Sequence, residues 1–127
     1  MNIENIDFRL GEFVKRLRIL SWNVNGIRAA YRKGFLEWLS KENPDILCLQ
    51  ETKAWKEQLP EELTDMKDYN AYFAESDRKG YSGVVIYSRN KPIEVGTGIG
   101  IDRFDTEGRV VWCKYTNFIL INVYFPN

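Results

Sequence analysis

Polar side chains that could hold a cation or a phosphate follow directly after three apolar runs of the chain. They are Asn23 and Asn25, Glu51 and Lys53, and Tyr124 and Asn127. A single carboxylate among amides is a poor cage for Ca²⁺, which takes many oxygen ligands, but it suits Mg²⁺, which keeps several waters and shares a substrate phosphate. The residue types therefore indicate Mg²⁺-assisted chemistry at a phosphate ester. The competing interpretation of Glu51 is an ordinary solvated glutamate in a loop.

Basic residues and glycines lie beside this set. They are Gly26, Arg28, Arg32, Lys33 and Gly34. Arginine and lysine are the usual donors to phosphate oxygens, and glycine lets the backbone approach a ligand closely. Taken singly, each basic residue is more simply a solvated surface charge. Tyr81 is either a further site residue or a half-buried aromatic of a sheet.

The composition limits both the class of protein and its chemistry. The 127 residues are 44% hydrophobic, with 18 basic and 18 acidic side chains, so we expect one globular unit whose anion-binding surface is local. There is no histidine, which excludes histidine metal ligands, Ser/His/Asp triads and histidine general bases within this sequence. No apolar run can span a bilayer and no secretory signal is present, so we expect an intracellular protein without membrane contact. Cys48 and Cys113 lie in apolar runs, which predicts buried free thiols, with a disulfide as the alternative.

The first two apolar runs must end at one edge of a sheet if the polar side chains are to meet. The expected elements are a strand over residues 17–25, a loop or short turn over 27–34, a helix over 35–42 and a strand over 45–50. Residues 46–49 have no polar alternation, which is typical of a strand buried on both faces. Strand, helix and strand form a crossover unit with parallel pairing. Asn23 and Glu51 would then leave neighbouring strands at their carboxyl ends, where α/β sheets bind ligands.

The remainder of the chain has mostly strand character. We expect a short helix over residues 60–66 and strands over 69–74, 83–87, 93–97, 110–115 and 118–125, the last two joined by a tight turn at Thr116 and Asn117. One crossover unit before an antiparallel meander predicts an α/β fold, a mixed β-sheet with helices on one face. Residues 1–16 have loosely helical apolar spacing and are treated as an N-terminal extension, packed on the domain or partly disordered, with no function assigned.

Five segments carry motifs of a known family. They are Trp22-Asn23-Val24-Asn25-Gly26-Ile27-Arg28-Ala29, Pro44-Asp45-Ile46-Leu47-Cys48-Leu49-Gln50-Glu51-Thr52-Lys53, Gly80-Tyr81-Ser82-Gly83-Val84, Glu107-Gly108-Arg109 and Asn122-Val123-Tyr124-Phe125-Pro126-Asn127. In this order they resemble the exonuclease III family of apurinic/apyrimidinic (AP) endonucleases, within the endonuclease/exonuclease/phosphatase superfamily. The resemblance covers residues 17–127, and its Arg-Ala and Gln-Glu-Thr-Lys contexts point to the DNA-repair branch.

The resemblance implies a role for each candidate residue. The catalytic residues would be Asn23, Glu51, Tyr124 and Asn127, with Glu51 as the metal ligand, Asn23 beside the metal and Asn25, acidic in some family members, as a supporting group. The DNA and phosphate contacts would be Arg28, Lys33, Lys53 and Tyr81. The implied cofactor is Mg²⁺, with Mn²⁺ as a substitute.

The implied reaction is hydrolysis of the DNA backbone 5′ to an abasic site in duplex DNA, a step of base excision repair, and 3′-exonuclease activity stays open beside it. Metal and positive donors would stabilise the developing charge. An abasic sugar is easily flipped out because it has no base to unstack. Such a protein would act in the cytoplasm, at the nucleoid, or in the nucleus.

The family pattern continues past the motif at Asn127 into a second half of a four-layer, DNase I-like α/β-sandwich. Residues 17–127 resemble its N-terminal half, and the aspartate and histidine that the family uses for proton transfer belong to the other half. We expect an apolar sheet face in residues 83–125, covered by that C-terminal half or by a second copy. The alternatives are one half of a split or homodimeric nuclease, a non-catalytic DNA-binding or interaction module, and a phosphoesterase for small phosphate esters.

Overall fold

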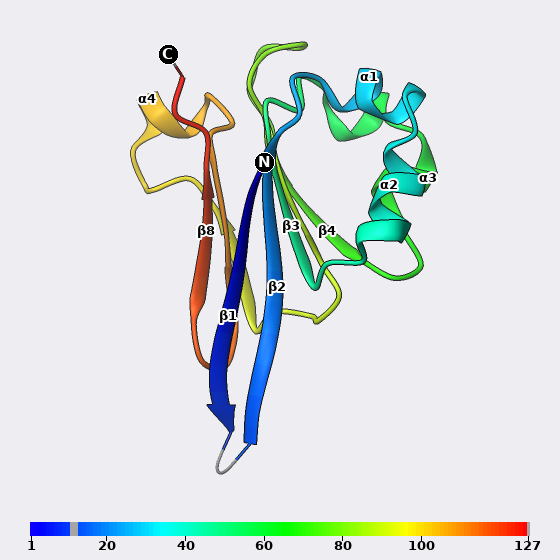
Figure 1. Ribbon diagram of the computed structural model, residues 1–127. Coiled ribbons are helices and arrows are strands. Elements are labelled where there is room, and N and C mark those ends of the chain that lie inside the picture. The colour runs from blue at the N-terminus through cyan, green and yellow to red at the C-terminus, as the bar shows by residue number, and fades with distance from the viewer. Residues whose placement is uncertain (11–12, 127) are drawn as a thin grey trace.

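The strands of residues 1–10 and 13–126, which this computed structural model describes, form two sheets. The elements are β1 (Asn2–Leu10), β2 (Phe13–Asn23), α1 (Ile27–Arg32), α2 (Phe35–Glu42), β3 (Ile46–Gln50), a 3₁₀ turn (Lys56–Gln58), α3 (Glu61–Thr64), β4 (Asn70–Ala74), β5 (Val84–Ser88), β6 (Glu94–Thr97), α4 (Asp102–Asp105), β7 (Val110–Lys114) and β8 (Ile119–Val123). The larger sheet has the order β1-β2-β3-β5-β4 and the smaller has β6-β7-β8. In Figure 1 the smaller sheet lies on one side of the larger one, and α1, α2 and α3 lie on the other.

The predicted crossover unit is present. β2 pairs in parallel with β3, which places Asn23 opposite Gln50, and α1 and α2 make the connection. β5 then pairs antiparallel with both β3 and β4, so the sheet is mixed, with helices on one face, as the sequence indicates. The prediction of a loop after the first strand is wrong for α1. Gly26, at φ 102°, turns the chain there, and a short helix without a side-chain cap follows.

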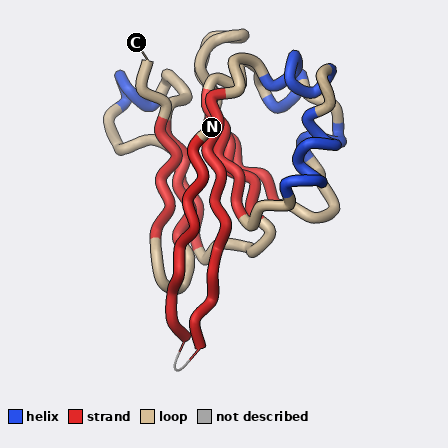
Figure 2. Tube along the Cα trace, in the orientation of Figure 1, coloured by secondary structure: helices blue, strands red, loops and turns tan. Residues whose placement is uncertain are grey.

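β5 shows how the two faces of the larger sheet are used. It is buried at every position, because both of its faces are covered. Val85 and Tyr87 pack with the helix side, whereas Val84 and Ile86 pack toward the smaller sheet. Successive side chains of a strand point to opposite faces, so one strand contributes to two cores. Figure 2 shows the resulting arrangement, with α1, α2 and α3 on one side of the strands and the short α4 on the other, beside the smaller sheet.

The predicted meander is divided between the sheets rather than added to one. The chain leaves the larger sheet after β5, and β6, β7 and β8 pair antiparallel with one another. Val111 and Cys113 of β7 are fully buried against the larger sheet. Cys48 and Cys113 are free, buried thiols, as predicted. Burial raises the pKa of Cys48 to about 12 and that of Cys113 to about 11.

The first residues of the chain form a strand that packs on the domain, so their loosely helical apolar spacing does not produce a helix. β1 pairs antiparallel with β2 from Asn2 opposite Ser21 onwards. The pairing brings Asp7 opposite Arg16, and their side chains form an ion pair at 2.8 Å. β1 and β2 extend beyond the other strands at the lower end of Figure 1.

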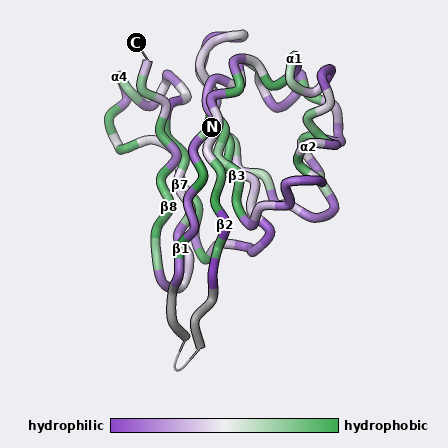
Figure 3. The backbone as a smooth tube through the Cα atoms, in the orientation of Figure 1, coloured by the Kyte–Doolittle hydropathy of each residue, from purple (hydrophilic) through white to green (hydrophobic). Residues whose placement is uncertain are grey.

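Apolar surface remains on the smaller sheet, in part as expected. β5 and the inner face of β7 are covered, but Ile119 and Ile121 on β8 are each 57% exposed and Phe125 is 82% exposed. Figure 3 shows the hydrophobic stretches of β3 and β8. Within the described residues, no helix is long and apolar enough to cross a membrane.

Candidate active site

The loops at the carboxyl ends of β2 and β3 are joined by backbone hydrogen bonds. Gly26 N–H donates to the carbonyl of Glu51 at 2.7 Å, and Thr52 N–H donates to the carbonyl of Gly83 at 3.0 Å. Gly83 N–H in turn donates to the carbonyl of Gly108 at 3.0 Å. The loop after β3 is therefore held from both sides, and four loops that are distant in sequence become one rigid edge.

Left-handed backbone conformations gather in these loops. Asn25, Glu51, Lys53 and Ser82 have φ values of 48°, 54°, 53° and 53°. A non-glycine residue in this region costs about 1–3 kcal/mol and persists only where the surroundings determine it. Here the backbone hydrogen bonds between the loops hold these residues in the left-handed conformation. The strain sets the directions in which the polar side chains leave the chain.

The carboxylate of Glu51 is the centre of the polar contacts. Its Oε1 accepts a hydrogen bond from Asn23 Nδ2 at 3.0 Å, and its Oε2 lies 3.5 Å from Lys53 Nζ. The hydroxyl of Tyr124 also hydrogen-bonds to it. The Asn23 contact first, and the Tyr124 contact second, lower the pKa of Glu51, while the same bond to Glu51 raises the pKa of Tyr124. The site therefore holds an ionised carboxylate beside a neutral phenol.

Asn23 is fixed by two contacts that set the direction of its amide. Its Oδ1 accepts a hydrogen bond from the Asn25 backbone N–H at 3.1 Å, while its Nδ2 donates to Glu51. The side-chain oxygen of Asn25 accepts from Lys53 Nζ at 2.6 Å. In this arrangement Asn23 presents its N–H groups to Glu51 and orients the carboxylate.

This set of donors fits a hydrated Mg²⁺ held chiefly by Glu51. Among residues 1–10 and 13–126 no group of three or more His, Cys, Asp or Glu side chains could form a metal cage. One ionised carboxylate next to a phosphate-binding surface is the arrangement that Mg²⁺ uses when waters and substrate complete its coordination. The ammonium group of Lys53 would compete with a cation for the same carboxylate.

The predicted phosphate-binding residues divide between two pockets. Arg28, Arg32 and Lys53 line one pocket of about 370 Å³, and Arg28 Nη2 donates to the backbone carbonyl of Lys53 at 3.0 Å. Lys33 lines a second pocket of about 370 Å³, together with Asn25. The first pocket gathers three positive charges at the edge where Glu51 lies, which is the charge that a phosphate backbone needs.

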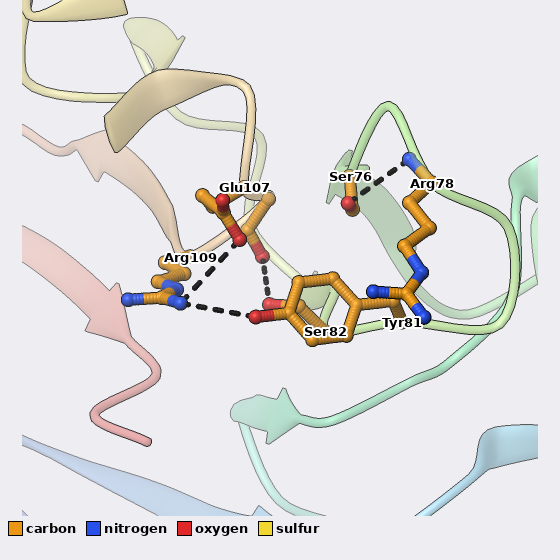
Figure 4. Close-up of polar contacts among 7 residues, drawn as sticks. Ser76, Arg78, Tyr81, Ser82, Glu107 and Arg109 are labelled. Carbon is orange, nitrogen blue, oxygen red and sulfur yellow. Dashed lines mark hydrogen bonds and ion pairs between the residues drawn. The ribbon is translucent and has the colours of Figure 1, made fainter. Parts of the chain in front are cut away.

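Tyr81 lies beside Arg109, a residue for which no separate role was predicted (Figure 4). Arg109 Nη2 donates to the hydroxyl of Tyr81 at 3.2 Å and to Glu107 Oε2 at 3.4 Å. The Nε of Arg109 is buried and has no hydrogen-bond partner among the described residues. Its positive charge also acts on Tyr124, whose pKa it lowers against the larger effect of Glu51. The Glu107-Gly108-Arg109 motif was the available signal, but only the fold shows that it meets Tyr81.

The buried side-chain amide of Asn122 holds β8 in place, and with it Tyr124, which follows β8. Asn122 is 2% exposed, and its Nδ2 donates to the carbonyls of Leu49 and Val85 at 3.0 Å each. Its Oδ1 accepts from Gln50 Nε2 at 2.8 Å. The amide thus ties the smaller sheet to β3, the strand that Glu51 directly follows. Sequence reasoning missed this role, because an asparagine inside an apolar run gives no local sign of its partners.

The tertiary structure thus brings one group of candidates together and leaves others apart. Asn23, Asn25, Glu51, Lys53 and Tyr124 form one cluster, Arg28 adjoins it through Lys53, Tyr81 joins Arg109, and Lys33 lies on the second pocket. Asn127, also predicted to face the site, lies outside the described residues.

The comparison with known families agrees with the fold and the motifs. The model of the Endonuclease/Exonuclease/phosphatase family matches residues 20–124. The chain belongs to this family.

The individual proteins to which the chain is similar include DNA-repair nucleases. The chain is 46% identical over 113 residues to the DNA repair nuclease APEX1 of Danio rerio, covering 87% of this chain and 36% of that protein. It is 42% identical over 112 residues to the exodeoxyribonuclease of Bacillus subtilis, covering 87% and 43%. Among solved structures, an AP endonuclease from Archaeoglobus fulgidus matches with a TM-score of 0.73 and 36% identity, covering 87% of this chain and 41% of that one. The chain thus spans about two-fifths of the length of these relatives.

Proposed function

We propose that this chain carries the metal-binding and phosphate-binding side of a DNA-repair phosphodiesterase that hydrolyses the backbone of duplex DNA 5′ to an abasic site. The observation that carries the proposal is the ionised carboxylate of Glu51, oriented by Asn23 and Tyr124. The basic pocket of Arg28 and Lys53 adjoins it. A carboxylate for a cation and several donors for phosphate, set at one sheet edge, are what phosphodiester hydrolysis requires.

Each residue of the cluster would do a separate part of the work. Arg28 and Lys53 would bind phosphates of the DNA strand, and the neutral hydroxyl of Tyr124 would hydrogen-bond at the scissile phosphate. Asn23 would hold Glu51 in the direction that the cation needs. When bound, Mg²⁺ supplies positive charge to the phosphate and lowers the pKa of a water.

Tyr81 and Arg109 would add contacts to the DNA backbone from the neighbouring loop. Arg109 places a positive charge beside Tyr81, and its hydrogen bond holds the phenol of that residue. Lys33 would contact the strand on the far side of Asn25. Such a repair enzyme would act at the nucleoid in the cytoplasm or in the nucleus.

Incision of a duplex with one abasic-site analogue, with Mg²⁺ and again with a chelator, tests this proposal. Incision that depends on Mg²⁺ and is lost in Glu51→Gln would support it, with Glu57→Gln as the matched control on an exposed glutamate. The assay should include the chain alone and the chain mixed with the remaining segment of a relative. Absence of incision in both samples, with the fold intact, would contradict the nuclease assignment.

A second candidate is a DNA-binding module without catalysis. The observation that favours it is the lack of any histidine in the sequence, together with a single carboxylate at the site. It would bind abasic duplex with an affinity that falls steeply as salt rises, and Glu51→Ala would leave that binding largely intact. A homodimeric or split nuclease would instead show incision only when a second chain is present.

A further inference from the structure

An aromatic pocket lies beside the candidate active site and has no part in the proposed reaction. Trp22, Phe35 and Trp38 line it, Asn25 and Lys33 belong to its polar lining, and its volume is about 370 Å³. We refer to it as the aromatic pocket. It is large enough for a planar ring system with an attached sugar.

The three rings of this pocket differ in how deeply they are buried. Phe35 is 2% exposed and stacks on Trp22, with ring centroids 6.3 Å apart and an interplanar angle of 29°. Trp22 and Trp38 lie 4.9 Å apart at 55° and are only partly buried. Phe35 therefore completes the core, whereas the two indoles keep surface that the core does not use. Indole rings that stay partly accessible can stack on planar ligands.

The position of the pocket indicates what kind of planar ligand it meets. Trp22 directly precedes Asn23 on β2, and Ala29 lines both the aromatic pocket and the basic pocket of Arg28 and Lys53. A strand with phosphates at both Arg28 and Lys33 would pass the aromatic pocket, which lies next to the basic pocket. Purines and pyrimidines all have a π-face, so indole stacking on them is tolerant of sequence.

We propose that Trp22 and Trp38 stack an unpaired nucleobase of the DNA strand whose phosphates are held by Arg28 and Lys33. The inference rests on the proposed action on DNA and names the part of the strand that this side of the site recognises. A paired base stays in the duplex, so the pocket selects a frayed, overhanging or single-stranded nucleotide.

Two matched probes test this on the unmodified chain. One is 2′-deoxyadenosine 5′-monophosphate, and the other is 2-deoxyribose 5-phosphate, which keeps the phosphate and sugar but lacks the base. Indole N–H signals in ¹H–¹⁵N spectra report on all four tryptophans of the chain. We expect the nucleotide to shift the signals of Trp22 and Trp38, to leave those of Trp55 and Trp112 in place, and to bind on the order of tenfold more tightly than the sugar phosphate. Equal affinity of the two probes, or shifts confined to Trp55 and Trp112, would overturn the proposal.

Substitutions at Trp38 give an independent measure. Trp38→Leu should abolish the preference for the nucleotide, whereas Trp38→Tyr should keep most of it, because a phenol ring still stacks. Trp112→Leu, on the smaller sheet, is the control and should change neither affinity.

A preference that survives Trp38→Leu would contradict the assignment, and if that variant fails to fold, the spectra of the unmodified chain decide. Neither measurement uses Mg²⁺ or incision. An active nuclease without the base preference would therefore refute the proposed base binding alone. Base binding without incision would refute the proposed nuclease activity alone.

Discussion

The ammonium nitrogen of Lys53 lies 3.5 Å from a carboxylate oxygen of Glu51, close enough to compete with a divalent cation for the same charge. The same nitrogen donates to the side-chain oxygen of Asn25 at 2.6 Å. Lys53 therefore neutralises the carboxylate in this structure. If Glu51 holds a metal and Lys53 a phosphate, as proposed, metal affinity and phosphate binding would both depend on this side chain.

Replacing Lys53 by methionine should tighten metal binding. The variant removes the competing charge and keeps a long side chain, and because the pair is partly exposed, we expect a gain of about two- to fivefold in Mn²⁺ affinity. Titration of Mn²⁺ followed by electron paramagnetic resonance measures it without any activity. Lys79→Met is the matched control, because Lys79 lies 4.0 Å from Glu57 away from the cluster. Equal Mn²⁺ affinity in the unmodified chain and Lys53→Met would refute the competition.

The ionised state of Glu51 should contribute a pH-dependent part of the stability. Its hydrogen bonds to Asn23 and Tyr124 lower its pKa in the folded chain from an ordinary value of 4.5. The contribution is therefore fully present above pH 4.5 and is lost as the pH falls through the lower pKa of the folded state. The free energy of unfolding of the unmodified chain, minus that of Glu51→Gln, should decline below about pH 4.5. Urea titrations between neutral pH and pH 3 measure this difference, and a difference that does not change with pH would contradict the prediction.

Removing the buried amide of Asn122 should destabilise the chain. Asn122→Ala leaves the carbonyls of Leu49 and Val85 buried without their donor, and it also removes the acceptor of Gln50. Such losses cost about 2–4 kcal/mol in the free energy of unfolding. Urea denaturation of this variant should be compared with Asn117→Ala, whose residue is exposed in the turn between β7 and β8. A cost within about 0.5 kcal/mol, the range of ordinary surface substitutions, would show that the network is not needed.

Two glycines with left-handed backbone allow steric crowding to be separated from backbone strain. Gly83 has φ 90°, and a Cβ there would overlap the hydroxyl of Thr52, whereas Gly80 has φ 73° and open space around it. Both alanine variants carry the strain of the left-handed region, but only Gly83→Ala must displace the buried side chain of Thr52, the residue after Glu51. We expect Gly83→Ala to cost at least about 1 kcal/mol more in unfolding free energy than Gly80→Ala. It should also weaken Mn²⁺ binding, and equal effects of the two variants on stability and Mn²⁺ affinity would argue against a close fit between these loops.

The crossover unit and the position of Glu51 could be predicted because their causes are local. The short apolar run from Ile46 to Leu49 is typical of a buried strand because Pro44 precedes it and polar residues follow it, and Pro44 also prevents the preceding helix from continuing. Parallel pairing follows from the strand–helix–strand order, so Asn23 and Glu51 had to share an edge. The family motifs around the same residues agree with this inference.

Other features depended on partners that the local pattern does not name. β1 was missed because the spacing of Phe8, Leu10 and Phe13 in the sequence suits a helix, and only pairing with β2 decides the conformation. The separate smaller sheet was missed because β7 has the same alternating pattern whichever sheet it joins.

By itself, the sequence determined the kind of elements, their order and the residue types available at the sheet edge, since periodicity, turn residues and side-chain chemistry are properties of neighbouring positions. The tertiary structure decided the contacts of those residues, including Tyr124 with Glu51, Arg109 with Tyr81 and Asn122 with Leu49. Each of these pairs is separated by more than twenty residues, so its contact forms only when the two sheets pack together. Only the Asn122 pair is also removed from water by that packing.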